Sequence, residues 1–146
     1  MKRFLIAALM VACLVPGCRK NPGPETLAHT FYQLCEIAAQ QGFDVVQMDI
    51  YGMLSEDSKK SLETRARNLN ERFDPSPPIE PYECLAFSSF LGLSGEFDSA
   101  RLAEGEKRVR LEITSNSTAS FMEFVKEEGD WKIDLPATLE LNKSGP

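Results

Sequence analysis

Five side chains in the first half of the sequence are of types that can donate or accept a proton in catalysis. They are His29, Tyr32, Asp44, Asp49 and Tyr51. A general acid or base must be held beside a second polar group and away from bulk water, because that environment moves its pKa toward the working pH. No sequence motif links any of the five to another. We therefore expect a solvated histidine, an Asp44 that caps a helix, and tyrosines that lie in the core or at its rim.

Patterns for nucleophilic and metal chemistry are also absent from the sequence. There is no G-x-S-x-G turn, and a single histidine is present to serve as the base for a serine. There is no C-x-x-C pair, and one histidine cannot complete a four-ligand zinc site. Glu123, Glu127, Glu128 and Asp130 gather where a turn is expected, and acids there are usually solvated. We expect no catalytic residue, no metal and no cofactor.

The charge balance limits the partners. The sequence has 16 Lys and Arg against 22 Asp and Glu, for a net charge of −6, and no run of basic residues is longer than a pair. Nucleic-acid grooves and polybasic membrane patches need concentrated positive charge, so we expect no nucleic-acid partner. A chain of 146 residues is long enough for one domain with its own core.

The first residues have the features of a secretion signal. Met1-Lys2-Arg3 is cationic, and residues 4–15 are uninterruptedly apolar. That stretch is too short to cross a bilayer core of ~30 Å at ~1.5 Å per residue. We expect residues 1–17 to be a signal peptide of the kind that the next residues specify, with an ordinary secretory signal peptide or a buried N-terminal helix as the alternatives.

The letters V-P-G-C, which end at Cys18, resemble the lipobox of bacterial lipoproteins, with Cys13 as a weaker rival acceptor. The resemblance implies that Cys18 is acylated, becomes the first residue and anchors the protein to a membrane of the bacterial cell envelope. For lipoproteins of enterobacteria-like systems, which the motif resembles, Arg19 rather than Asp directly after the cysteine implies the periplasmic face of the outer membrane. Removing residues 1–17 takes away two basic residues and no acids, which leaves a net charge of −8.

Two cysteines, Cys35 and Cys84, remain in the folded part. In an oxidising compartment a pair of this kind can form a disulfide. Free cysteine also behaves as a small apolar residue, so two buried thiols on separate elements are the alternative. The sequence leaves both open.

Three helices are expected first. Pro24 is tolerated in a first turn, Gly42 is a suitable residue after a last turn, and apolar residues recur at helical spacing between them. Asp44 should cap a second helix that runs to about Met53, and Ser55 should begin a third. Their inward-facing residues are expected to be Leu27, Phe31, Leu34, Cys35 and Ala38, then Val46, Ile50 and Leu54, then Leu62, Ala66, Leu69 and Phe73.

A proline-rich connection over residues 74–81 separates these helices from four strands, because each proline removes a backbone donor. Residues 82–92 are expected to form a short helix. The strands should cover residues 97–102, 108–113, 118–126 and 131–135, with turns between them. In the third strand, Phe121 and Val125 are expected to face one way and Met122 and Phe124 the other. We divide the chain into a tether at 18–23, a single α+β domain at 24–136 and a flexible tail at 137–146.

A helix of the form P-E-x-x-A-x-x-F-Y, the Leu-Ser-Glu-Asp-Ser break at residues 54–58 and the closing residues 124–134 with Gly129 and Trp131 resemble the nuclear transport factor 2-like superfamily. Within it they are similar to small bacterial lipoproteins of unknown function. The resemblance implies a cone of N-terminal helices packed on a curved antiparallel sheet of about four strands. It also implies a pocket lined by Phe31, Tyr32, Tyr51, Phe121 and Trp131.

Three functions remain open. The first is a lipid-anchored, non-catalytic envelope domain that binds a partner protein or a small apolar ligand through the sheet or the open end of the cone. The second is an isomerase-like or cyclase-like enzyme that uses an acid inside the cone, since enzymes of this superfamily place Asp, His or Tyr there. The third is a structural module that forms a homodimer through an exposed apolar patch on the sheet, with Met122 and Phe124 as part of that patch.

Overall fold

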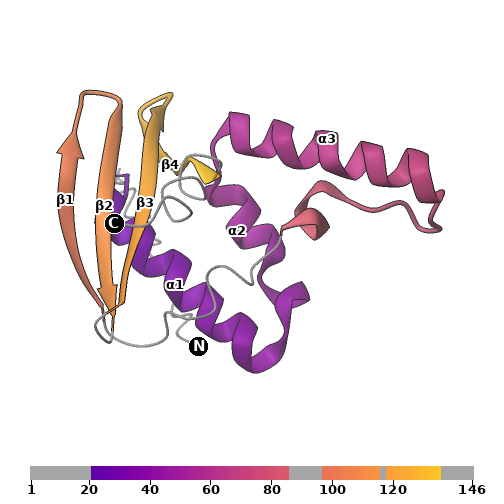
Figure 1. Cartoon of the computed structure of the whole chain (residues 1–146), viewed down its shortest axis with the longest axis horizontal. Coiled ribbons are helices and arrows are strands. Elements are labelled where there is room, and N and C mark those ends of the chain that lie inside the picture. The colour runs from indigo at the N-terminus through magenta and orange to yellow at the C-terminus, as the bar shows by residue number, and fades with distance from the viewer. Residues whose placement is uncertain (1–20, 86–96, 116–117, 136–146) are drawn as a thin grey trace, which may run out of the picture.

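The computed structural model describes residues 21–85, 97–115 and 118–135, which form three α-helices and a four-stranded antiparallel sheet. The α+β class expected from the sequence is confirmed. Helix α1 (Pro24–Gln41) crosses one face of the sheet, and α2 (Gln47–Met53) lies beside it (Figure 1). Helix α3 (Glu56–Phe73) points away from the sheet.

Helix α1 has the bounds that the sequence predicts. Pro24 occupies the first turn, Glu25 lies next to it, and the Gly42 N–H donates to the Ala38 carbonyl at the other end. Gly42 has a φ of 102°, a conformation that favours glycine and stops the helix there. The helix buries one face, formed by Leu27, Ala28, Phe31, Tyr32, Cys35 and Ala38.

The segment after α1 differs from the prediction. Residues Phe43–Val45 form a 3-10 helix, η1, and α2 begins only at Gln47. Asp44 is exposed within η1, and α2 has no side-chain cap, so the predicted capping role of Asp44 is wrong. The apolar spacing still decides what is buried, because Val46, Ile50 and Leu54 are in the core as expected.

Helix α3 is buried only at its beginning. Its N-cap, Ser55, accepts a hydrogen bond from the Ser58 N–H. Along the predicted apolar stripe, Leu62 and Ala66 are buried, Leu69 is half-buried and Phe73 is exposed. Each further turn of the helix therefore lies farther from the core.

The connection after α3 turns back along the helix. Asn70 exchanges two hydrogen bonds with Ile79, one from the Ile79 N–H at 2.8 Å and one to the Ile79 carbonyl at 2.9 Å. A short 3-10 helix, η2 (Pro81–Cys84), follows, and it is the main contact of α3. The predicted helix at 82–92 is confirmed only as this single turn, because residues 86–92 lie outside the described part of the chain. We call α3 together with residues 74–80 the arm.

The sheet is a simple meander. Strands β1 (Asp98–Glu104), β2 (Arg108–Ser115), β3 (Thr118–Glu127) and β4 (Asp130–Ile133) lie side by side in chain order. The four strands predicted from the sequence correspond to these, with ends shifted by a few residues. The pairing of β1 with β2 shifts register between Arg101 and Ala103, which is a bulge on the edge strand. Glu128 and Gly129, both with positive φ, make the tight turn between β3 and β4.

The side chains of β3 are divided between its two faces as predicted, but the face expected to be exposed is the buried one. Met122 pairs with Leu111 and Phe124 with Val109, and all four side chains are buried against the helices. Phe121 and Val125 lie on the other face and are half-buried. The expectation of an exposed patch at Met122 and Phe124 is therefore wrong, because β3 has apolar residues on both faces and only its pairing with β2 determines which face is buried.

Candidate functional site

The acid–base candidates do not converge. His29 is exposed on α1 and stacks on Phe97, with ring centroids 4.1 Å apart. Asp44 and Asp49 are exposed on η1 and α2, and Tyr51 is half-buried on α2. Tyr32 alone is in the core. No two of these five form a hydrogen bond with each other among the described residues.

Tyr32 occupies an aromatic cluster on the buried face of α1. Its ring centroid is 5.5 Å from that of Phe31 and 5.0 Å from that of Phe97. Burial raises the pKa of Tyr32 to about 12, and Ser120 on β3 opposes this rise only in part. No described group completes a hydrogen bond of good geometry with the hydroxyl. The phenol therefore stays protonated at neutral pH and cannot act as a base.

Tyr51 has a different environment at the surface. The Lys59 Nζ lies 5.8 Å from the centre of its ring. The pKa of Tyr51 is raised, first by partial burial and then by the charge of Glu63. Tyr51 is therefore an aromatic at the rim, as the sequence suggests, and the acid next to it is Glu63 rather than another of the five candidates.

The five residues expected to line a pocket are divided between two faces of the sheet. Phe31 and Tyr32 are core residues in contact with each other. Trp131 is half-buried near the start of β4, where Lys126 Nζ lies 5.6 Å from its ring centre. Tyr51 is at the rim, and Phe121 lies on the sheet face that points away from the core. The structure therefore does not gather the five into one lining.

Cys35 and Cys84 are free, buried thiols on α1 and η2. This arrangement corresponds to the second alternative left open by the sequence. Burial raises the pKa of Cys35 to about 12, and it also raises that of Cys84. Such thiols react slowly because the thiolate is the nucleophile. A disulfide between them under oxidising conditions stays a prediction.

Among residues 21–85, 97–115 and 118–135, no three His, Cys, Asp or Glu side chains are grouped so that they could hold a metal ion. In the same ranges no helix is both long and apolar enough to span a bilayer.

Charged side chains form a network on the outer face of the sheet that the sequence analysis missed. The Glu123 carboxylate accepts a hydrogen bond from Arg110 Nε at 3.0 Å and lies 3.8 Å from Arg108 Nη1. Arg108 Nη1 also donates to Asp134 Oδ2 at 3.0 Å. Glu123 and Asp134 are buried, so their charges need these partners. The signal was the alternation of Arg108 and Arg110 in β2, which becomes informative only with the register that places Arg110 opposite Glu123.

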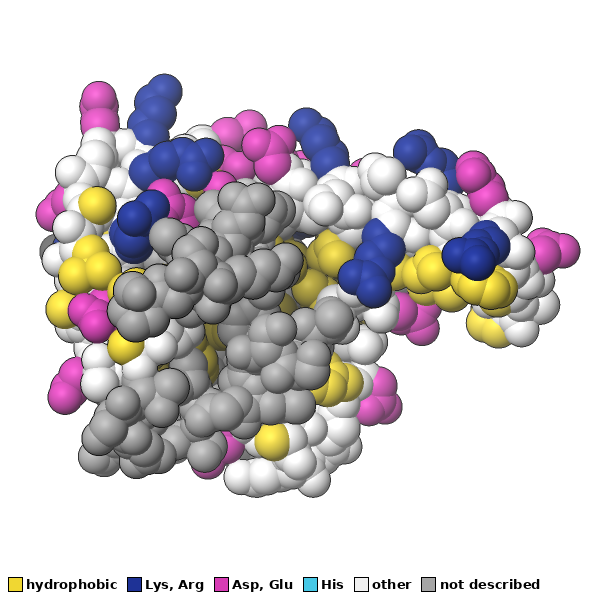
Figure 2. Space-filling model, viewed as in Figure 1, with side chains coloured by type: hydrophobic (Ala, Val, Ile, Leu, Met, Phe, Trp, Pro, Cys, Tyr) yellow, Lys and Arg dark blue, Asp and Glu magenta, His cyan; other side chains and the backbone are white. Residues whose placement is uncertain are grey.

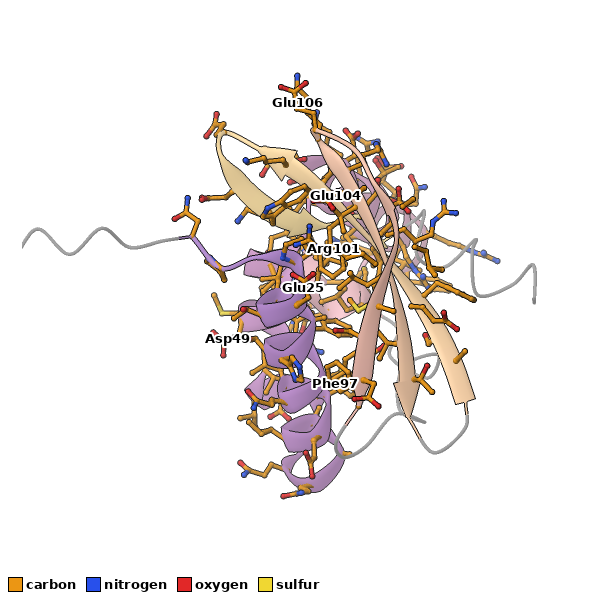
Figure 3. All side chains as sticks on the ribbon, turned by 90° about the vertical axis from the view of Figure 1, so that its left-hand side faces the viewer. Glu25, Asp49, Phe97, Arg101, Glu104 and Glu106 are labelled. Atoms are coloured by element: carbon orange, nitrogen blue, oxygen red, sulfur yellow. The ribbon has the colours of Figure 1, made fainter. Side chains whose placement is uncertain are left out.

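A second ionic contact joins α1 to the edge strand. Arg101 on β1 lies between Glu25 on α1 and Glu104 on its own strand (Figure 3). The Arg101 Nη2 donates to Glu25 Oε2 at 3.1 Å, and hydrogen bonding to Arg101 lowers the pKa of Glu25. All three side chains are substantially exposed, so the contact orients α1 more than it stabilises the fold.

The N-terminus of α3 is fixed to the sheet by hydrogen bonds. The Glu56 N–H donates to the Glu127 carboxylate, at 3.1 Å to the nearer oxygen. Ser58 Oγ lies 2.7 Å from Ser55 Oγ, donates to the Ile133 carbonyl and accepts from the Leu135 N–H. These bonds determine the direction in which the arm leaves the body, by which we mean the sheet together with α1, η1 and α2.

The end of the arm is exposed and combines an apolar ring with a cation. Phe73 is 62% exposed, and the guanidinium of Arg72 lies 5.2 Å from the centre of its ring. Figure 2 shows hydrophobic and basic side chains along the arm, and the molecule is hollowed beneath it.

A second group of exposed apolar residues lies where α1, η1 and α2 meet. Met48 is 70% exposed, Val45 53% and Ile37 37%. The three elements contact one another, and we call residues 36–49 the shoulder. Four of the five large hydrophobic residues exposed in the described ranges belong to the shoulder or to the end of the arm.

No protein-family model, curated protein or solved structure matches the chain.

Proposed function

We propose that this protein is a lipid-anchored domain of the bacterial cell envelope that binds protein rather than catalysing a reaction, and that the arm is its contact surface. The relation to the nuclear transport factor 2-like superfamily, anchoring through Cys18 and the periplasmic face of the outer membrane are parts of this proposal. The observation that carries it is the loss of burial along α3, from Leu62 in the core to Phe73 in solvent.

The energetics of the arm support binding. An exposed phenylalanine gains roughly 1.5–3 kcal/mol when it becomes fully buried, and the fold leaves that gain unused at Phe73. The Asn70–Ile79 hydrogen bonds hold the returning connection against α3, so the arm is already ordered before a partner arrives. A preformed surface loses less conformational entropy on binding.

The body supports the non-catalytic part of the proposal. The sheet face toward the helices is filled by side chains that are at most 1% exposed, such as Val109, Leu111, Ile113, Met122 and Phe124. Of the described acid–base candidates, His29, Asp44 and Asp49 are exposed, and no two of the five are joined by a hydrogen bond.

Anchoring is tested by fractionating cells that express the full chain or Cys18→Ala. We expect the full chain in the membrane fraction and Cys18→Ala in the soluble periplasmic fraction, with loss of the lipid mass. Cys13→Ala is the control and should behave as the wild type. Membrane association of Cys18→Ala with an unchanged lipid mass would refute the anchor.

Binding by the arm is tested with a photoreactive phenylalanine analogue at position 73 in intact cells. We expect irradiation to give discrete protein adducts. The control position is Glu106, which is exposed at the tip of the β1–β2 hairpin, on the side opposite the arm (Figures 1 and 3). No adduct from position 73, or the same adducts from both positions, would refute the arm as the contact surface.

A further inference from the structure

The end of the arm has a defined chemistry. Arg65 and Arg72 are seven residues apart, about two helical turns, so they lie on the same side of α3 and border the apolar stripe that ends at Phe73. Arg67 lies on the opposite side of the helix. The surface that the arm offers is therefore an aromatic ring with arginines along one border, which suits a partner that is apolar and acidic.

The shoulder has the complementary chemistry. Its exposed apolar residues, Ile37, Val45 and Met48, are accompanied by the exposed acids Glu36, Asp44 and Asp49. No Lys or Arg occurs anywhere from residue 21 to residue 58, so no basic side chain of that stretch offsets these acids. Figure 3 shows Asp49 projecting from the body.

We infer that the partner of the arm is a second copy of this chain, whose shoulder receives Phe73 and Arg72. The inference rests on the proposed function and names the occupant of the same surface. Arginines line one border of the exposed apolar stripe on the arm, and carboxylates accompany the exposed apolar residues of the shoulder. Such local charge matching selects partners and fixes their register. Any other partner would need the same two features as the shoulder, which are exposed apolar residues and carboxylates beside them.

The position of the two surfaces allows a closed dimer. The arm extends over the side of the body on which the C-terminal end of α1 and η1 lie (Figure 1), with the hollow between them (Figure 2). Two copies related by a two-fold axis can each place an arm on the other's shoulder. The contact is then made twice, and the assembly closes instead of continuing as a filament.

The experiment uses two co-expressed full-length chains with different tags, one of which carries the photoreactive analogue at position 73. We expect an adduct that contains both tags, and we expect peptide mapping to place the second end of the crosslink in the shoulder, residues 36–49, of the other chain. Adducts that contain only other proteins would refute self-association while leaving the proposed function intact. No adduct at all would refute both.

Charge reversal tests the predicted contact. We expect Arg72→Glu to lower the yield of the two-tag adduct about tenfold, and Arg67→Glu, the matched control on the other side of α3, to leave it unchanged. The shoulder variant Asp44→Arg with Asp49→Arg should lower the yield similarly when it is the only chain present.

The two variants expressed together provide the rescue. In a mixed dimer the arm that carries Arg72→Glu would meet the reversed shoulder, and the unaltered arm would meet the unaltered shoulder. We therefore expect the mixture to recover the wild-type yield. An adduct that is insensitive to Arg72→Glu, or a mixture that recovers nothing, would refute the arm-on-shoulder contact.

Discussion

Tyr32 and Cys35 lie one turn apart on the buried face of α1, and burial is the main influence on both side chains. It raises the pKa of each to about 12, from 10.0 for Tyr32 and from 9.0 for Cys35. Groups of this kind are core residues with a cost for ionisation. Their raised pKa values therefore do not identify a catalytic site, since none of the other acid–base candidates is hydrogen-bonded to either side chain in the described part of the chain.

These pKa values predict how stability depends on pH. The unfolded chain loses the Cys35 proton near pH 9, whereas the folded chain keeps it to about pH 12. The free energy of unfolding should therefore be fully retained below pH 9 and fall above it, with Cys35 contributing up to about 1.4 kcal/mol per pH unit. Tyr32 adds the same kind of loss above pH 10.

The contribution of Cys35 is isolated by comparing wild type with Cys35→Ala in denaturant titrations at pH 8, 9 and 10 under reducing conditions. We expect the difference in free energy of unfolding between the two proteins to shrink between pH 9 and pH 10. Curves that stay parallel over this range would show that Cys35 ionises equally in the folded and unfolded chains.

Glu123 and Glu25 provide a matched pair of ionic contacts that differ in burial. Glu123 is buried and contacts two arginines, whereas the Glu25 side chain is 38% exposed. We expect Glu123→Ala to lower the free energy of unfolding by about 1–3 kcal/mol and Glu25→Ala by less than about 1 kcal/mol. Denaturant titration measures both, and equal losses would mean that burial does not decide the value of the contact.

At the scale of elements, the sequence predicts best where chemistry marks the ends or where one face alone is apolar. Pro24 and Gly42 mark both ends of α1, and the alternation of Val109, Leu111 and Ile113 identifies the buried face of β2. In β3 the apolar residues occur on both faces, so periodicity gives no direction. Only pairing with β2 determines which face is buried.

The arm could be predicted only in part. The sequence indicates a stripe from Leu62 to Phe73 and a proline-rich return, and the structure has both a helix with this stripe and the returning connection. It does not indicate how far the core extends beneath the stripe, because helical spacing is the same for a covered and an uncovered face. The exposure of Phe73 beside Arg72 therefore emerges only from the structure.

The junction between α3 and the sheet should depend strongly on Ser58. Its hydroxyl contacts Ser55, Ile133 and Leu135, and it is fully buried. We expect Ser58→Ala to lower the free energy of unfolding by about 1–3 kcal/mol, because the Leu135 N–H loses its partner. Ser61→Ala, an exposed change on the same helix, is the control and should cost less than about 0.5 kcal/mol. A loss at Ser58 no greater than at Ser61 would contradict this account of the junction.

For the whole molecule, stability and association should separate at the end of the arm. Phe73 and Arg72 are exposed, so we expect Phe73→Ser and Arg72→Glu to change the free energy of unfolding by no more than about 0.5 kcal/mol each. Denaturant titration of the two variants beside the wild type measures this. A change in association caused by these variants then reports the contact rather than unfolding.

The most direct test of the account is the protein mass of the full-length chain extracted from membranes in mild detergent, determined by light scattering coupled to size-exclusion chromatography. We predict a mass above that of a single chain for the wild type and for Arg67→Glu. The variant that combines Phe73→Ser with Arg72→Glu should have the mass of a single chain. A single-chain mass for the wild type, or the same mass for all three proteins, would contradict the claim that the arm joins this protein to another.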